Sequence, residues 1–153
     1  MFTQFIDSPL GAVKISATAS GISEVLFTDV ATTGEPSALT QLAATQLQAY
    51  FAGTLQQFTL PLAATGTVFQ QHVWQALCQV PFGTTCSYSD IARSVSNVKA
   101  VRAVGAANGR NPIAIVVPCH RVIGANGTLT GYAGGLERKA WLLKHEQRQK
   151  ALF

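Results

Sequence analysis

The chain has 153 residues, of which 48% are hydrophobic and 12% are charged. This balance excludes a disordered chain, which has too little apolar surface to offset the entropy lost on folding. The longest apolar run, residues 112–119, is far shorter than the roughly 20 residues of a membrane-spanning helix. Residues 1–7 lack the basic and apolar regions of a secretory signal. We therefore expect a globular cytoplasmic protein that does not bind membranes.

Charge is distributed unevenly along the chain. Residues 1–65 hold one basic and four acidic side chains, whereas residues 66–153 hold ten basic and three acidic ones. The two parts carry formal charges of −3 and +7. A basic half indicates a polyanionic partner such as nucleic acid, although a merely solvated basic surface has the same composition.

The first part alternates apolar and polar residues as short strands do. Turn residues separate three such runs, at 2–6, 12–17 and 22–27, which predicts a small antiparallel sheet. A helix over 37–51 should cover this sheet, with Ser37 as its N-cap and Gly53 as its stop.

A stretch rich in Ala, Thr and Gly at 61–67 coincides with the change in charge. We therefore predict that residues 1–62 form an N-terminal α/β lobe and residues 66–153 a C-terminal domain. The expected fold class is α+β, a small antiparallel sheet with a helix packed on a mainly helical lobe.

The second part has helical spacing from Phe69 onward. Two short helices follow, at 89–95 and 98–107, and the turn between them suits a helix-turn-helix. Such a pair more often serves packing than DNA binding. A strand over 113–117 should then lead to Pro118-Cys119-His120-Arg121, and a last helix over 136–147 should bury Leu136, Ala140 and Leu143.

The three cysteines have spacings that fit neither a zinc site nor a disulfide framework. We expect no metal and reduced thiols, with Cys78 and Cys86 as small buried hydrophobes. Cys119 differs because His120 and Arg121 follow it and His145-Glu146 can return from the last helix to orient an imidazole. A base or positive field of this kind lowers a thiol pKa. Spacing alone leaves both a structural and a reactive Cys119 open.

The run from Asn111 to Ile123 resembles the active-site signature of the O6-alkylguanine-DNA alkyltransferases. The likeness spans residues 66–146, and its further matching motifs are Phe69-Gln70-Gln71, Ser87-Tyr88, Arg102-Ala103-Val104-Gly105, Gly131 to Leu136 and His145-Glu146. The resemblance implies DNA repair by irreversible, single-turnover transfer of an alkyl group from O6-alkylguanine to Cys119, with O4-alkylthymine left open as a second substrate. It also implies no cofactor, because the damaged DNA is the donor.

The resemblance further implies specific roles around Cys119. His120 takes the thiol proton through a water, and Glu146 holds the imidazole. Asn111 ties the active-site turns together, while Tyr88 turns the neighbouring phosphate and donates a proton to guanine N3. A plain turn residue and a core tyrosine are the alternatives for these two.

On the DNA side, the resemblance implies a monomer that binds the minor groove of duplex DNA and flips the damaged nucleotide into a pocket. Arg102 fills the vacated stack; a surface phosphate contact is its alternative. The implied DNA contacts are Arg102, Tyr88, Ala103 and Arg121, and the implied base pocket is Val122, Tyr132, Ala133 and Gly134.

Three other functions fit part of this sequence. One is a binding-only relative that marks lesions, against which the presence of Cys119 argues. The others are a helix-turn-helix regulator with a structural Cys119 and a cysteine hydrolase using Cys119 and His120. A hydrolase turns over repeatedly and ignores DNA, whereas a self-alkylating transferase stops after one event.

Overall fold

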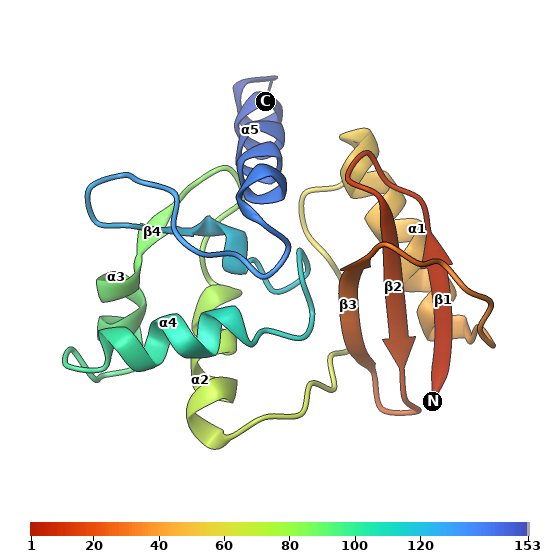
Figure 1. The fold of residues 1–153 in the computed structure, drawn as a ribbon, viewed down its shortest axis with the longest axis horizontal. Coiled ribbons are helices and arrows are strands. Elements are labelled where there is room, and N and C mark those ends of the chain that lie inside the picture. The colour runs from red at the N-terminus through yellow and green to blue at the C-terminus, as the bar shows by residue number, and fades with distance from the viewer. Residues whose placement is uncertain (153) are drawn as a thin grey trace. The chain divides into compact units, whose positions relative to one another are not determined.

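The computed structural model describes residues 1–152 and divides into two compact units (Figure 1). The first unit contains residues 1–65 together with residues 112–116. The second contains residues 66–111 and the chain from Val117 onward. A short piece of the second half of the sequence thus belongs to the first unit, which the sequence patterns did not predict.

The first unit is a three-stranded antiparallel sheet covered by one helix, as predicted. The strands β1 (Phe2–Ile6), β2 (Ala12–Ala17) and β3 (Ile22–Thr28) pair in the order β1-β2-β3. Helix α1 (Ala38–Ala52) packs against them with Leu47 and Tyr50 buried. The predicted ends of α1 are confirmed: Ser37 caps its N-terminus, and Gly53 takes the left-handed conformation at its C-terminus.

The predicted strand over 113–117 is wrong. Ile113 makes one isolated bridge to Val25, flanked by hydrogen bonds from Val25 N to Pro112 O and from Ala114 N to Val25 O, both 2.9 Å long. The backbone then turns, because Ile115 has a φ of 71°. Ile113, Ile115 and Val117 are nevertheless buried. Residues 113–117 are therefore apolar because they form a buried turn, and not because they form a strand.

The second unit is mainly helical and contains one two-stranded parallel ladder. Its elements are α2 (Val68–Leu77), β4 (Cys86–Ser87), α3 (Tyr88–Ser94), α4 (Val101–Gly109), the one-turn helix η1 (Cys119–Arg121), β5 (Val122–Ile123) and α5 (Leu136–Leu152). Strands β4 and β5 pair in parallel, which brings the start of α3 beside the end of η1. The indole of Trp74 donates to Ala107 O at 2.9 Å and ties α2 to α4.

Helices α3 and α4 form the expected helix-turn-helix pair, but α4 starts three residues later than predicted. The intervening turn is longer because Ser96 has a φ of 59° and Asn97 N bonds back to Ala92 O at 2.9 Å. The face of α4 that carries Arg102, Ala103 and Ala106 is exposed.

Helix α5 buries a different face from the predicted one. Leu136 and Ala140 are exposed, whereas Lys139, Leu142 and Glu146 are almost fully buried. A face with a charge at two of three positions does not stand out as apolar, so periodicity missed it. Within residues 1–152, no helix is long and apolar enough to span a membrane.

Candidate active site

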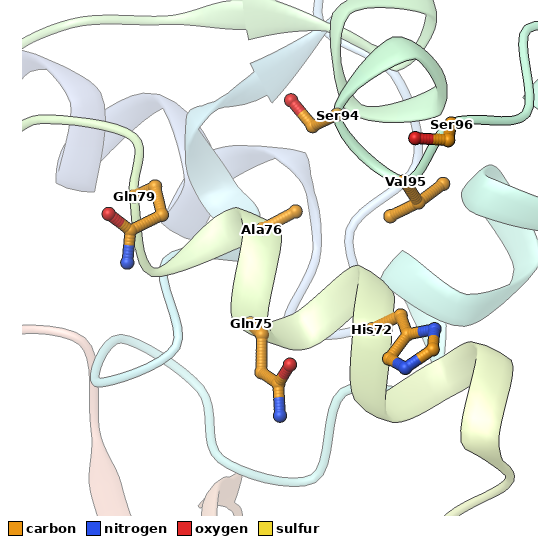
Figure 2. A pocket seen from close by; sticks show the side chains of 7 residues that line it. All are labelled: His72, Gln75, Ala76, Gln79, Ser94, Val95 and Ser96. Atoms are coloured by element: carbon orange, nitrogen blue, oxygen red, sulfur yellow. The ribbon is translucent and has the colours of Figure 1, made fainter.

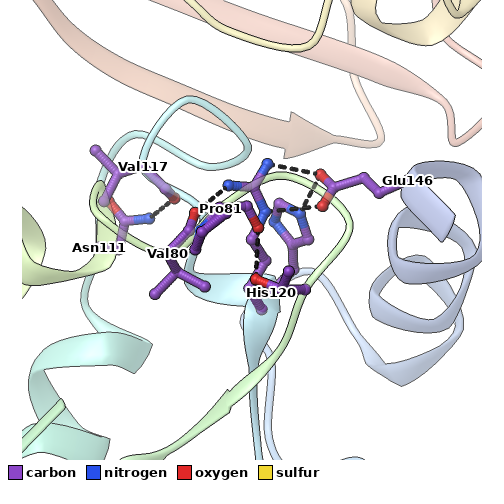
Figure 3. Close-up of polar contacts among 8 residues, drawn as sticks. Val80, Pro81, Asn111, Val117, His120 and Glu146 are labelled. Atoms are coloured by element: carbon purple, nitrogen blue, oxygen red, sulfur yellow. Dashed lines mark hydrogen bonds and ion pairs between the residues drawn. The ribbon is translucent and has the colours of Figure 1, made fainter. Parts of the chain in front are cut away.

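Cys119 is the first residue of η1, and its side chain is only 5% exposed. Two amides hold the backbone around it. Asn111 Nδ2 donates to Val117 O at 2.9 Å, and Asn108 Nδ2 lies 3.4 Å from Cys119 O (Figure 3 draws the first of these bonds). Asn111 therefore connects the turn before the apolar segment to the turn that precedes the cysteine.

His120 and Glu146 form a buried pair on η1 and α5. Nε2 of His120 lies 2.7 Å from Oε2 of Glu146, and the two side chains are 0% and 1% exposed (Figure 3). An ionised carboxylate only accepts hydrogen bonds, so Nε2 carries the proton and Nδ1 is the unprotonated nitrogen. Nδ1 is buried and has no partner in the described part of the chain. Such an imidazole can accept a proton through Nδ1.

Arg121 does not lie where we expected. Its Nε and Nη2 donate to Glu146 at 2.7 and 3.1 Å, and its Nη1 donates to Val80 O at 2.7 Å. The side chain is 8% exposed. All three guanidinium nitrogens therefore bind protein, which corrects the expected DNA contact: Arg121 anchors Glu146 instead.

Burial and charge set the protonation of this array. Burial lowers the pKa of His120 despite the opposing influence of Glu146, so the imidazole is neutral near pH 7. Burial opposes ionisation of Glu146, but hydrogen bonds from His120 and Arg121 and the charge of Arg121 hold the pKa of its carboxyl well below the usual range. A neutral base and an ionised acceptor are what proton removal from a thiol requires.

The Cys119 thiol itself behaves differently from our expectation. Burial raises its pKa, while the hydrogen bond from Asn111 and the charge of Lys139 only partly oppose this. The free protein thus holds a thiol, because desolvation outweighs the favourable neighbours. Cys119 needs a base at the moment of reaction, and His120 is the adjacent candidate.

Lys139 lies fully buried on α5 beside this array. Its ammonium donates to Val122 O at 2.5 Å and to Thr130 O at 3.0 Å. The side chain of Thr130 in turn bonds the hydroxyl of Tyr88, with 2.6 Å between the two oxygens. These contacts connect the residue after η1, the 130–135 segment and the start of α3.

The remaining predicted residues fall into two groups. Arg102 and Ala103 are exposed on α4, and Tyr88 is half-buried at the start of α3. Of the expected base pocket, Val122 is buried, Tyr132 and Gly134 are half-buried, and Ala133 is exposed. The hydroxyl of Tyr132 is buried without a partner among the described residues. Burial raises the pKa of Tyr132, so its hydroxyl stays protonated.

Sequence reasoning missed Lys139, Thr130 and Asn108. For Lys139 the signal was its helical spacing, three residues after Leu136 and four before Leu143. The hydroxyl of Thr130 and the amide of Asn108 leave no comparable pattern in the sequence. The predicted burial of Cys78 and Cys86 is also wrong, because Cys78 is exposed and Cys86 half-buried. Their positions beside a helix end and on a two-residue strand offer little cover.

A separate groove of about 440 Å³ runs between α2 and the end of α3 (Figure 2). Its lining includes His72 and Gln75 of α2 and Ser94 and Ser96 at the end of α3. None of its lining residues belongs to the array around Cys119.

Comparison with known proteins finds matches for both units of the chain. The model of the 6-O-methylguanine DNA methyltransferase DNA binding domain matches residues 68–148, and that of the 6-O-methylguanine DNA methyltransferase ribonuclease-like domain matches residues 1–64. The chain is 46% identical to a methylated-DNA–protein-cysteine methyltransferase of Methanosarcina barkeri, over 96% of this chain and 98% of that protein. A protein of the same name from Mycobacterium leprae is 49% identical over 94% of this chain and 91% of that protein.

Solved structures agree with these matches. The crystal structure of Mycobacterium tuberculosis OGT in complex with DNA has a TM-score of 0.89 to this chain, with 46% identity and coverage of 96% of this chain and 93% of the other. The relatives are therefore similar along nearly their whole length.

Proposed function

This chain belongs to the 6-O-methylguanine DNA methyltransferase family, and we propose that it repairs DNA by moving the methyl group of O6-methylguanine onto Sγ of its own Cys119. The observation that carries the proposal is the buried array of Cys119, His120 and Glu146, with Nδ1 of His120 open to accept a proton. Two relatives that are 46% and 49% identical to this chain are named methylated-DNA–protein-cysteine methyltransferases.

The reaction forms one bond and breaks another. Sγ of Cys119 attacks the methyl carbon in line, the carbon–O6 bond breaks, and its electron pair stays with the purine. The thiol proton passes through a water to Nδ1 of His120, which Glu146 stabilises as it becomes charged. The product is a thioether, which has no pathway back to the thiol here. Each molecule therefore acts once, and the DNA itself supplies the group without a cofactor.

The pocket must hold a base that has left the duplex, because a stacked O6-methyl group is out of reach of a buried thiol. We propose that the 130–135 segment, with Tyr132, Ala133 and Gly134, and the backbone of Val122 line this pocket. Tyr88 donates a proton to guanine N3 as negative charge builds on the purine. O4-alkylthymine remains a candidate second substrate of the same pocket.

We propose that α4 binds the minor groove of duplex DNA. Its exposed face combines Arg102 with small residues that allow the backbone to approach closely. Arg102 occupies the space that the flipped nucleotide leaves. One monomer suffices for this reaction, and the free thiols of Cys78, Cys86 and Cys119 suit a cytoplasmic protein.

The test is the intact mass of the protein after mixing with a short duplex that contains O6-methylguanine. We expect one added methyl group per molecule, no second event, and none with Cys119→Ser. That variant should still bind the duplex. A binding-only lesion marker predicts no mass change in either protein, and a hydrolase predicts turnover without a stable adduct.

A further inference from the structure

We propose that Thr130 is a positioning residue for Tyr88, in that its hydroxyl donates to the phenol oxygen and leaves the phenol proton available to the substrate. This inference rests on the proposed function, because it concerns how Tyr88 acts during alkyl transfer. It starts from the 2.6 Å contact between Thr130 Oγ1 and the Tyr88 hydroxyl, two groups that lie 42 residues apart.

The contact permits either oxygen to be the donor. If Tyr88 donated, its only proton would be used and it could not donate to a base. If Thr130 donates, the phenol keeps its proton and its oxygen accepts a hydrogen bond. Because a hydrogen bond to the charged form favours that form, the Thr130 donor stabilises the negative charge that develops on the phenol oxygen as its proton moves to the purine. The chemistry required of Tyr88 therefore selects Thr130 as the donor.

Thr130 is itself held in place from the other side. Its carbonyl accepts from Lys139 Nζ at 3.0 Å, and the same ammonium bonds Val122 O at 2.5 Å. Val122 directly follows η1, which carries Cys119. Lys139 is fully buried, so its two bonds to backbone carbonyls hold these segments together inside the unit. One ammonium group thus holds both the backbone after Cys119 and the residue that contacts the phenol oxygen.

Tyr88 is fixed at its other end by its helix. It is the first residue of α3, where Ser87 and Asp90 form a capping box, with Ser87 Oγ accepting from Asp90 N at 3.1 Å and Ser87 N donating to Asp90 Oδ2 at 2.9 Å. The backbone of Tyr88 is therefore set by the cap, and Thr130 sets its hydroxyl. Loss of the Thr130 hydroxyl should affect proton donation without displacing the helix.

The experiment measures single-turnover methyl transfer and duplex affinity for Thr130→Val, Thr130→Ser, Tyr88→Phe and the double variant Thr130→Val with Tyr88→Phe. Thr130→Val keeps the side-chain shape and the Lys139 contact but removes the hydroxyl. We expect transfer to slow about 3- to 10-fold, the effect of one hydrogen bond, with affinity unchanged. Thr130→Ser should restore the rate, and the double variant should be no slower than Tyr88→Phe.

The control is Thr128→Val, which removes an exposed hydroxyl that bonds Asn126 Oδ1 at 2.7 Å in the same loop. It should react at the wild-type rate. A wild-type rate for Thr130→Val, or rate losses that multiply in the double variant, would overturn the positioning role. Absence of transfer by the wild-type protein would instead refute the proposed function. Melting temperatures show whether each variant is folded, and the serine variant keeps the test valid if the valine one is unstable.

Discussion

Glu146 binds Arg121 through both of its carboxylate oxygens, at 2.7 and 3.1 Å, while the second oxygen also lies 2.7 Å from His120. One buried carboxylate therefore serves a fixed cation and a titratable base. Arg121 keeps Glu146 ionised, and ionised Glu146 keeps the proton of His120 on Nε2. The same carboxylate therefore contributes both to the stability of the site and to its chemistry, and variants can tell these two contributions apart.

Glu146→Gln should lose both stability and methyl transfer. It leaves the buried Arg121 without its counter-charge, which costs about 3–5 kcal/mol, and His120 loses its carboxylate. The double variant Arg121→Met with Glu146→Gln removes both charges and should regain much of that stability while transfer stays slow. Urea unfolding and single-turnover rates measure the two effects. Recovery of transfer together with stability would mean that Glu146 acts only structurally.

Cys119 should be the methylated residue although it is the most buried of the three cysteines. A small electrophile in solution should label the exposed Cys78 first, because access controls that reaction. Damaged duplex should label Cys119 alone, because only the pocket presents the methyl carbon to its sulfur. Peptide mapping after each treatment distinguishes the two patterns. Methyl groups on Cys78 or Cys86 after exposure to damaged DNA would contradict the assignment.

Lys139→Met should move the pH profile of methyl transfer to higher pH. Burial already raises the pKa of Cys119, and the Lys139 charge opposes that rise, so its removal raises the pKa further. Thiolate is present above the raised pKa and lost below it, so the rate should fall more near pH 7 than at high pH, where loss of the bonds to Val122 O and Thr130 O still slows transfer. Lys144→Met, on the exposed side of the same helix, is the control. An unshifted profile would remove Lys139 from the electrostatics of the thiol.

Arg102→Ala should reduce the transfer rate far more than duplex affinity. The Arg102 side chain takes the place of the extruded base in the stack, and extrusion of a paired nucleotide costs a few kcal/mol. The defect should shrink when the damaged base is mismatched or single-stranded. A phosphate contact instead predicts equal defects on all substrates and a salt-dependence slope smaller by about one counterion. Rates on paired and unpaired O6-methylguanine, with affinities at several salt concentrations, decide between them.

Local patterns predicted the sheet and the capped helix α1, because Ser37, Gly53 and strand alternation act over a few residues. They failed at Ile115, whose left-handed backbone turns an apolar run that periodicity assigns to a strand. They also failed on α5, where the buried face carries Lys139 and Glu146. Burial of charge is decided by distant partners, such as the Val122 and Thr130 carbonyls. For Arg121, sequence placed the residue beside the cysteine but not the direction of its side chain.

The Pro112–Val116 segment makes the boundary at residues 61–67 a poor place to cut the protein. A fragment that ended there would lose the neighbour of Val25 and expose the edge of β3, a surface that favours aggregation. A fragment that began there would carry a detached apolar stretch directly ahead of Cys119. Limited proteolysis in the linker should therefore yield two pieces that stay together.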